Sequence, residues 1–175
     1  MWRNDLNDAT NYVTTTMKET FEAFGSVSMP KLLYLDYNCF QRSFDDQAQA
    51  RIRMETIACG EIFAKAETGD VELAWSFMHE DENAISPFLD RKAAVIKLSE
   101  LCRVRLGPSE RMKSEALALQ GKNNLSAKDA LHVACASLSN IKFFLTCDDR
   151  VIKRTGGQIG DMVVMNPVTY VVKER

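Results

Sequence analysis

Two short apolar runs, each leading to an aspartate, constrain the fold of this 175-residue chain more than any other feature. Residues 32–35 read Leu-Leu-Tyr-Leu and stop at Asp36, and residues 143–145 read Phe-Phe-Leu and continue through Thr-Cys to Asp148. Neither run alternates apolar with polar side chains, which is typical of strands covered on both faces in a parallel sheet. We therefore predict two buried strands with acidic residues at their carboxyl ends.

The segments around these runs alternate between helical and extended patterns. Helices are predicted from about Ser43 to Gly69, after Ser86-Pro87, after Gly107-Pro108, after Ser126 and briefly after Asp148. Further strands are predicted at residues 71–78, 103–106 and 162–165. Strands separated by helices favour βαβ units, so we expect an α/β domain with a mostly parallel sheet covered on both faces.

The length and composition fit a single folded domain. Apolar residues make up 46% of the chain and charged residues 26%, which is the balance of a globular protein. We place this domain at residues 29–175, because Met29 and Pro30 directly precede the first strand. Residues 1–28 form an N-terminal extension, in which Leu6, Val13 and Met17 make a weak apolar stripe that predicts a helix.

Charge and hydropathy exclude some classes of function. No segment approaches the roughly 20 continuous apolar residues that span a bilayer, so we expect no membrane span and a cytoplasmic protein. The five cysteines include no Cys-x-x-Cys pair, which favours reduced thiols in the core over a zinc ribbon or disulfides. A net charge of −2 argues against a protein that wraps nucleic acid through a large basic surface, but not against an enzyme that cuts it.

The strand-end acids are the first candidates for a functional site. Ligands of open α/β sheets bind outside the carboxyl ends of the strands, where Asp36 and Asp148 should lie. Two such acids need a cation, a hydrogen-bond network or water. Asp129 follows Ser126 in the first turn of a helix whose N-terminus should face the same edge. It can cap the helix, serve the site, or do both.

A fourth acid is expected in the segment after the strand predicted at residues 71–78. Glu80, Asp81 and Glu82 are the candidates, and we choose Glu82; the alternative is a polar surface loop. Carboxylates without a His or Cys cluster favour hard cations such as Mg²⁺ or Mn²⁺. Such a site can orient and activate water for phosphodiester hydrolysis. A receiver-type phosphoryl-transfer domain fits less well, because Asp36 has no adjacent acid.

At this point the chain resembles the PIN domain family. The resemblance covers roughly residues 30–170 and rests on residues 33–38, 76–83, 126–134 and 144–148. It implies a PIN-like three-layer fold in which a central, mostly parallel, five-stranded sheet is flanked by helices. It also implies a metal-dependent ribonuclease that uses Mg²⁺ or Mn²⁺.

Carried over to this sequence, the resemblance implies particular roles for the acids. Asp36, Glu82, Asp129 and Asp148 would be the catalytic and metal-binding residues, and Thr146 would position the last Asp or a water. Asn38 either bonds to a site carboxylate or shapes the turn after the strand. His132, a lone helical histidine, is left out of the catalytic set because such residues are more often packed in the core.

The resemblance also extends these expectations to partners. PIN domains act on RNA and often pair, which implies an RNA substrate and a possible homodimer. Similarity in size to the VapC branch of the family implies the toxin role of a toxin–antitoxin pair and an antitoxin protein as a partner. The alternative from a different class is a catalytically silent PIN-fold module that binds or regulates.

Overall fold

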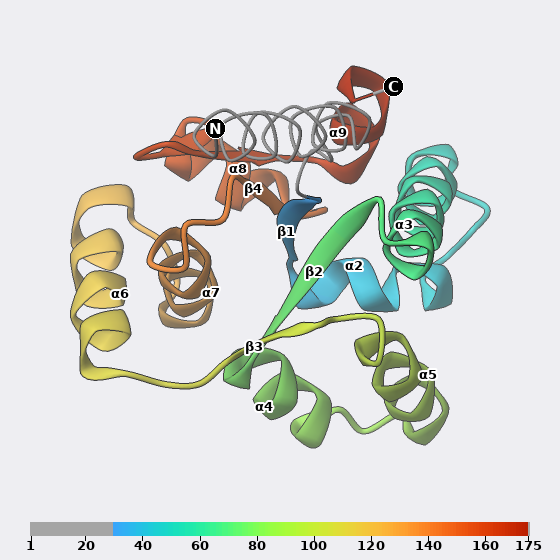
Figure 1. The fold of residues 1–175 in the computed structure, drawn as a ribbon, viewed down its shortest axis with the longest axis horizontal. Helices are drawn as coiled ribbons and strands as arrows, with labels where there is room; N and C mark the ends of the chain where they lie inside the picture. Colours follow the sequence, from blue (N-terminus) through green and yellow to red (C-terminus); the bar gives the residue numbers. More distant parts are fainter. Residues whose placement is uncertain (1–29, 175) are drawn as a thin grey trace, which may run out of the picture.

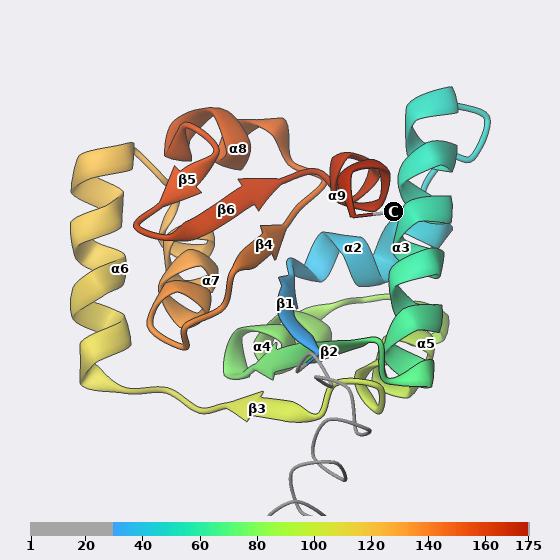
Figure 2. The same ribbon diagram turned by 45° about the horizontal axis from the view of Figure 1, so that its top comes forward.

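A computed structural model of the chain describes residues 30–174 (Figure 1). Within them, six strands form one sheet in the order β3-β2-β1-β4-β6-β5, with helices on both of its faces (Figures 1 and 2). The predicted α/β fold class is confirmed. The helical extension predicted over residues 1–28 lies outside the described residues.

The elements follow the predicted alternation of strands and helices. The strands are β1 (Lys31–Leu35), β2 (Val71–Ser76), β3 (Val104–Leu106), β4 (Phe143–Leu145), β5 (Gln158–Ile159) and β6 (Met162–Met165). The helices are α2 (Tyr37–Gln41), the 3-10 turn η1 (Arg42–Phe44), α3 (Ala50–Thr68), α4 (Phe77–Ile85), α5 (Leu89–Ser99), α6 (Glu110–Asn123), α7 (Ala127–Ser137), α8 (Asp149–Thr155) and α9 (Pro167–Lys173). Within residues 30–174, none of these helices combines the length and apolar character needed to span a bilayer.

The sheet is parallel except at one edge. β1 pairs in parallel with both β2 and β4, β2 pairs with β3, and β4 pairs with β6. The described residues add one strand to the five that the resemblance implied, because β5 runs antiparallel to β6. Gly160 lies in the turn between these two strands and has φ of 55°, a backbone conformation that glycine adopts without a steric cost.

Two apolar layers fix the sheet between the helices. Leu33 and Leu35 point from β1 into a core that α2, α3, α5 and α9 complete. Tyr34, between them, points to the opposite face, where α6 and α7 pack. This alternation explains why residues 33–35 of the strand carry no charged side chain: both faces of the strand are buried there.

The first long helix starts later than the sequence predicted. The 3-10 turn η1 ends at Phe44, residues 45–49 form an irregular turn, and α3 begins only at Ala50. Two side-chain hydrogen bonds explain the difference, because Gln47 donates to the carbonyls of Arg42 and Asp45 and so holds the intervening residues in a turn. The predicted end at Gly69 is correct, and this residue adopts φ of 85°.

Candidate active site

The sheet reverses its strand order between β1 and β4. From β1 the chain moves outward to β2 and β3, and then returns to place β4 on the other side of β1. At such a switch point the connections leave in opposite directions and open a crevice at the carboxyl ends of the strands. Asp36 directly follows β1 and Asp148 follows β4. The topology therefore brings the two predicted strand-end acids to one crevice.

Asp36 is the most buried of the four predicted acids, with 8% of its surface exposed. Its Oδ2 accepts hydrogen bonds from the Thr146 hydroxyl at 2.6 Å and from Asn38 Nδ2 at 2.7 Å. Thr146 Oγ1 in turn accepts from the peptide N–H of Asp148 at 3.1 Å. Thr146 thus links the two strand-end acids, and both predicted support residues contact Asp36.

The environment of Asp36 disfavours a negative charge. Burial raises the pKa of its carboxyl group, and the neighbouring carboxylates of Glu82 and Asp129 raise it further. His132 and the Thr146 hydroxyl act in the opposite direction without cancelling the shift. A cation in the crevice would favour the charged form of Asp36.

Glu82 lies on a helix and not in a loop. We expected a strand as far as Met78 and an acidic loop beyond it, but β2 ends at Ser76 and α4 starts at Phe77. The reason is a cap in which His79 Nδ1 accepts from the peptide N–H of Ser76 at 3.0 Å, so helix geometry begins within the apolar run. Glu82 consequently faces the crevice.

Glu82 has two cationic or proton-donating neighbours on α7. Lys128 Nζ donates to its Oε2 at 2.8 Å, and His132 Nε2 bonds to its Oε1. Burial favours the neutral acid, but these contacts with His132 and Lys128 hold the pKa of Glu82 below its usual range. Glu80 and Asp81, the alternative candidates, are exposed side chains of α4 and do not line the cleft described below.

A chain of buried hydrogen bonds fixes His132. Its Nδ1 bonds to the Tyr34 hydroxyl at 2.7 Å, and that hydroxyl bonds to Ser76 Oγ at 2.6 Å. Ser76 contacts His79, whose Nε2 donates to the carbonyl of Leu35 at 2.7 Å. Burial raises the pKa of Tyr34 well above its usual value and lowers that of His79 to about 3. Sequence reasoning missed this chain; the only signal was that His132 falls one turn after Asp129.

Asp129 occupies the first turn of α7. Its peptide N–H donates to Ser126 Oγ at 3.1 Å, so the predicted helix cap exists. Within residues 30–174, no hydrogen bond from the Ser126 N–H to the Asp129 carboxylate closes a reciprocal capping box. The Asp129 carboxylate is therefore available to the crevice while its backbone completes the cap.

Asp148 caps α8 and pairs with the following arginine. Its Oδ1 accepts from the peptide N–H of Arg150 at 2.8 Å, and Arg150 Nη2 reaches Oδ2 at 2.7 Å. These contacts hold the pKa of Asp148 below its ordinary value. The arginine side chain is largely exposed, so it can leave the carboxylate at little cost.

The four acids line one cleft of about 440 Å³. Its other charged side chains are Lys128, Arg150 and Arg154. Ligand atoms of Asp36, Glu82 and His132 lie within 4.8 Å of one another, whereas Asp129 and Asp148 stand outside this group. The oxygen-rich donor set and the open cleft fit a hard divalent cation that keeps several waters.

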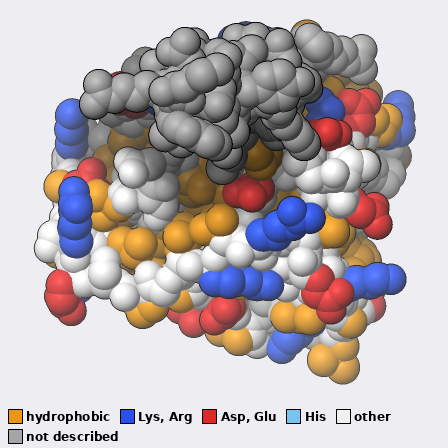
Figure 3. All heavy atoms as spheres, viewed as in Figure 1, with side chains coloured by type: hydrophobic (Ala, Val, Ile, Leu, Met, Phe, Trp, Pro, Cys, Tyr) orange, Lys and Arg blue, Asp and Glu red, His pale blue; other side chains and the backbone are white. Residues whose placement is uncertain are grey.

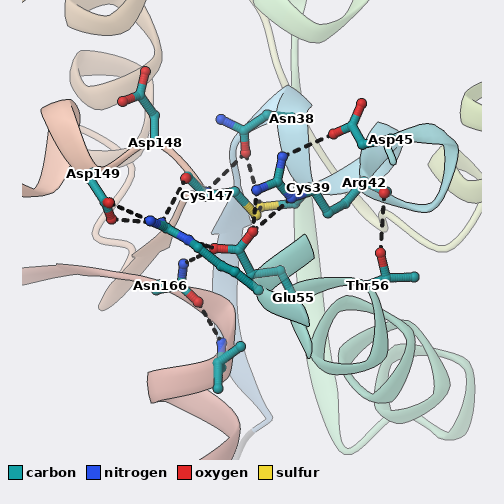
Figure 4. Close-up of polar contacts among 12 residues, drawn as sticks. Asn38, Cys39, Arg42, Asp45, Glu55, Thr56, Cys147, Asp148, Asp149 and Asn166 are labelled. Atoms are coloured by element: carbon teal, nitrogen blue, oxygen red, sulfur yellow. Dashed lines mark hydrogen bonds and ion pairs between the residues drawn. The ribbon is translucent and has the colours of Figure 1, made fainter. Parts of the chain in front are cut away.

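A second polar network supports the turn that carries Asp148 (Figure 4). Its centre is Glu55 of α3, whose side chain is 1% exposed. Arg42 Nε donates to it at 2.7 Å, Arg51 Nε at 2.9 Å and Asn166 Nδ2 at 2.6 Å. Arg51 also pairs with Asp149 on α8. Although burial favours the neutral acid, the bonds from Arg51, Asn166 and Arg42 hold the pKa of Glu55 below its usual range.

The charged surface outside the cleft carries no extended basic area on the face shown in Figure 3. Acidic and basic side chains alternate over the part of that face that grey atoms do not cover. This agrees with the net charge of −2.

The fold and this cleft define an α/β protein with an acidic cleft at the topological switch point of its sheet. The sequence profile of the PIN domain family matches residues 33–158. The chain therefore belongs to the PIN domain family, which confirms the resemblance. No curated protein sequence matches the chain significantly.

Two solved structures resemble this chain at low sequence identity. VapBC2 from Rickettsia felis, bound to a DNA fragment from their promoter, is 12% identical with a TM-score of 0.53; the match covers 77% of this chain and 98% of that one. PAE2754 from Pyrobaculum aerophilum is 12% identical with a TM-score of 0.48; the match covers 83% of this chain and 97% of that one. The first of these supports the fold assignment.

Proposed function

We propose that this protein is a metal-dependent endoribonuclease that hydrolyses RNA phosphodiester bonds. The observation that carries the proposal is the convergence of Asp36, Glu82, Asp129 and Asp148 on one cleft at the switch point of the sheet. These four acids would hold Mg²⁺ or Mn²⁺. Membership of the PIN domain family supports nuclease chemistry at this position.

Metal bound here would supply charge stabilisation and an activated water for in-line displacement at phosphorus. The protein's own residues prepare the site for it. Thr146 and Asn38 fix the orientation of the Asp36 carboxylate because both donate to its Oδ2 and neither donates to Oδ1. His132 bonds through Nδ1 to the Tyr34 hydroxyl and through Nε2 to Glu82, and so fixes the position of the Glu82 carboxylate.

Basic side chains at the rim complete the proposed substrate site. Lys128, Arg150 and Arg154 line the same cleft as the acids. Their flexible ammonium and guanidinium groups can bind backbone phosphates on either side of the scissile bond. A few local contacts of this kind suit a nuclease that holds a short stretch of RNA.

We extend the proposal to a toxin whose antitoxin partner covers the cleft, in the cytoplasm where cellular RNA is found. The support is family membership and the fold shared with the VapC-containing complex named above. Co-expression with the neighbouring open reading frames, followed by growth measurement and size-exclusion chromatography with light scattering, tests the toxin role, the antitoxin and the expected homodimer together.

The direct test is cleavage of end-labelled RNA by the purified chain. We expect cleavage with Mg²⁺ or Mn²⁺, its loss in EDTA, and a reduction of at least 100-fold in the Asp36→Asn variant. Glu82→Gln should behave similarly, whereas Glu80→Gln and Asp81→Asn on the same helix should retain activity and serve as matched controls.

Two outcomes would contradict the proposal. Equal cleavage by the wild type and Asp36→Asn would place the activity elsewhere or in a contaminant. Absence of cleavage across varied RNAs, together with no binding of millimolar Mg²⁺ or Mn²⁺ by calorimetry, would favour the catalytically silent module.

A further inference from the structure

Three cysteines from distant parts of the chain meet directly behind the acid cleft. Cys39 lies on α2, Cys59 on α3, and Cys147 in the connection from β4 to α8. All three are buried, with 1%, 2% and 8% of their surfaces exposed. Their sulfur atoms lie within 4.8 Å of one another, and Cys39 Sγ is 4.0 Å from Cys147 Sγ. We call this group the thiol triad.

The spacing of the triad matches that of sulfur ligands around one metal ion. A zinc–sulfur bond of about 2.3 Å places two sulfurs about 3.8 Å apart in tetrahedral geometry and about 4.0 Å apart in trigonal geometry. The Cys39–Cys147 separation of 4.0 Å already has this value. The remaining separations are at most 4.8 Å, so they need to shorten by no more than about 1 Å to reach these values. The protein backbone therefore presents three sulfurs in a nearly finished coordination geometry.

Disulfide formation explains the triad less well. A disulfide needs an S–S distance of about 2.05 Å, so two of these sulfurs would have to approach by about 2 Å in a closely packed core, and the third thiol would stay unpaired. Simple core packing does not require three sulfurs to meet either. Cys102 and Cys135 are equally buried and belong to no such group among the described residues.

The surroundings provide an entry path. A pocket of about 500 Å³ reaches Cys147 and is also lined by Asn38 and Arg51. Arg51 Nη2 lies 3.4 Å from the Cys147 carbonyl oxygen. An ion can therefore reach the edge of the triad at Cys147 from solvent.

The triad is joined to the acid cleft through short connections. Asn38, which bonds to Asp36, precedes Cys39 and accepts the peptide N–H of Cys147 at 3.1 Å. Cys147 in turn precedes Asp148. Figure 4 shows the Cys39 and Cys147 side chains beside Asn38. An ion bound by the triad would tie together the segments that carry two of the four acids.

We propose that Cys39, Cys59 and Cys147 form a binding site for one thiophilic metal ion, of the chemical class of Zn²⁺, Cd²⁺ and Cu⁺. Soft thiolate ligands select these ions over Mg²⁺ and Mn²⁺. The site is separate from the carboxylates of the cleft and does not depend on the nuclease proposal. Bound metal would stabilise the packing of α2 and α3 against the end of β4.

Cadmium titration of the reduced, full-length chain tests this proposal. With millimolar Mg²⁺ present to occupy carboxylate sites, we expect one equivalent of Cd²⁺ to produce the ultraviolet thiolate-to-cadmium charge-transfer band. Cys39→Ser, Cys59→Ser and Cys147→Ser should each weaken Cd²⁺ binding at least tenfold. Cys102→Ser and Cys135→Ser are the matched controls and should bind as the wild type does. Equal binding by all five variants, or no charge-transfer band, would overturn the proposal.

X-ray absorption of the loaded wild type avoids reliance on variants that fail to fold. We expect three sulfur ligands around Cd²⁺, and parallel samples with Zn²⁺ and Cu⁺ identify the preferred ion by competition with a chelator. A first shell of oxygen and nitrogen alone would refute the site. The Asp36→Asn variant should retain the sulfur-ligated ion, so failure of the nuclease proposal leaves this test intact.

Discussion

Replacing Asp36 with asparagine should stabilise the metal-free protein while abolishing the proposed RNA cleavage. The carboxylate is buried, and burial together with the charges of Glu82 and Asp129 raises its pKa. Asparagine keeps an oxygen that can accept from Thr146 and Asn38 but removes the charge. A buried acid that lowers the stability of the free protein but is needed to bind a ligand is expected in a preformed binding site.

The magnitude follows from the spacing of the acids. Two unit charges 4.8 Å apart, the limit for Asp36 and Glu82, repel by about 3.5 kcal/mol at an effective dielectric constant of about 20. Lys128 and His132 offset part of the Glu82 charge. We therefore expect Asp36→Asn to increase the free energy of unfolding by about 1–2 kcal/mol in the absence of metal.

Urea unfolding at pH 7 in EDTA, and again with Mn²⁺, measures the free energy of unfolding of both proteins without and with metal. Mn²⁺ at about 100 times its dissociation constant should stabilise the wild type by about 2.7 kcal/mol and the substituted chain far less, so the order of stability reverses. Because the pKa of Asp36 is raised in the folded state, the metal-free wild type should lose stability as pH rises through that pKa. The difference between the two proteins should accordingly shrink at lower pH.

The matched control for Asp36→Asn replaces an acid outside the cleft on α4. Asp81→Asn, an exposed acid on α4, should change the free energy of unfolding by no more than about 0.5 kcal/mol under either condition. Two results would contradict the prediction: Asp36→Asn is less stable than the wild type in EDTA, or Mn²⁺ stabilises both proteins equally. Either would show that the acids do not repel one another in a site that binds a cation.

Three further predictions concern the networks around the cleft. Glu55→Gln leaves two guanidinium groups facing a neutral acceptor and should lower the free energy of unfolding by about 2–3 kcal/mol in urea at pH 7. The control, Glu67→Gln at an exposed position of the same helix, should lower it by about 0.5 kcal/mol or less. Equal effects would show that the buried network does not stabilise the fold. Tyr34→Phe removes the central hydroxyl of the buried hydrogen-bond chain and should lower the free energy of unfolding by about 1–3 kcal/mol. It should also raise the Mn²⁺ concentration needed for half-maximal cleavage. An unchanged metal dependence would show that the hydrogen-bond chain does not affect the site. Lys128→Gln removes a cation that competes for Glu82 and should tighten Mn²⁺ binding in calorimetry several-fold, and weaker binding would contradict the competition.

The sequence predicts the strand-end acids well because their signal is local. A fully apolar run that stops at an aspartate, as at Leu35 and Asp36, reports burial on both faces and the end of a strand in the same few residues. Asp148 lies three residues beyond the apolar run that forms β4, and the sheet order then places both acids at the switch point.

Other features depend on contacts that no local pattern carries. The apolar run after β2 continues through Met78, so the start of α4 is visible only from the bond between His79 and the Ser76 backbone. His132 looked like a packed core residue, and it is buried, yet its ring links Tyr34 to Glu82. Its role depends on tertiary neighbours, which sequence spacing alone could not supply.

The thiol triad illustrates the same limit more sharply. Its three members come from three elements, and their spacing in the sequence resembles no metal-binding motif. Only the packing of α2 and α3 against the end of β4 brings the sulfurs together. Composition indicated reduced core thiols, and the fold determines which of them meet.

Anomalous diffraction from crystals soaked in Mn²⁺ shows directly whether the four acids hold a metal ion. We expect a manganese peak in the cleft, with Asp36 and at least one of Glu82, Asp129 and Asp148 within direct coordination distance, about 2.0–2.3 Å, and Arg150 displaced from Asp148. The peak should be absent in Asp36→Asn crystals soaked in the same way. A fully soaked wild-type crystal without manganese among these four carboxylates would show that they do not form a metal site.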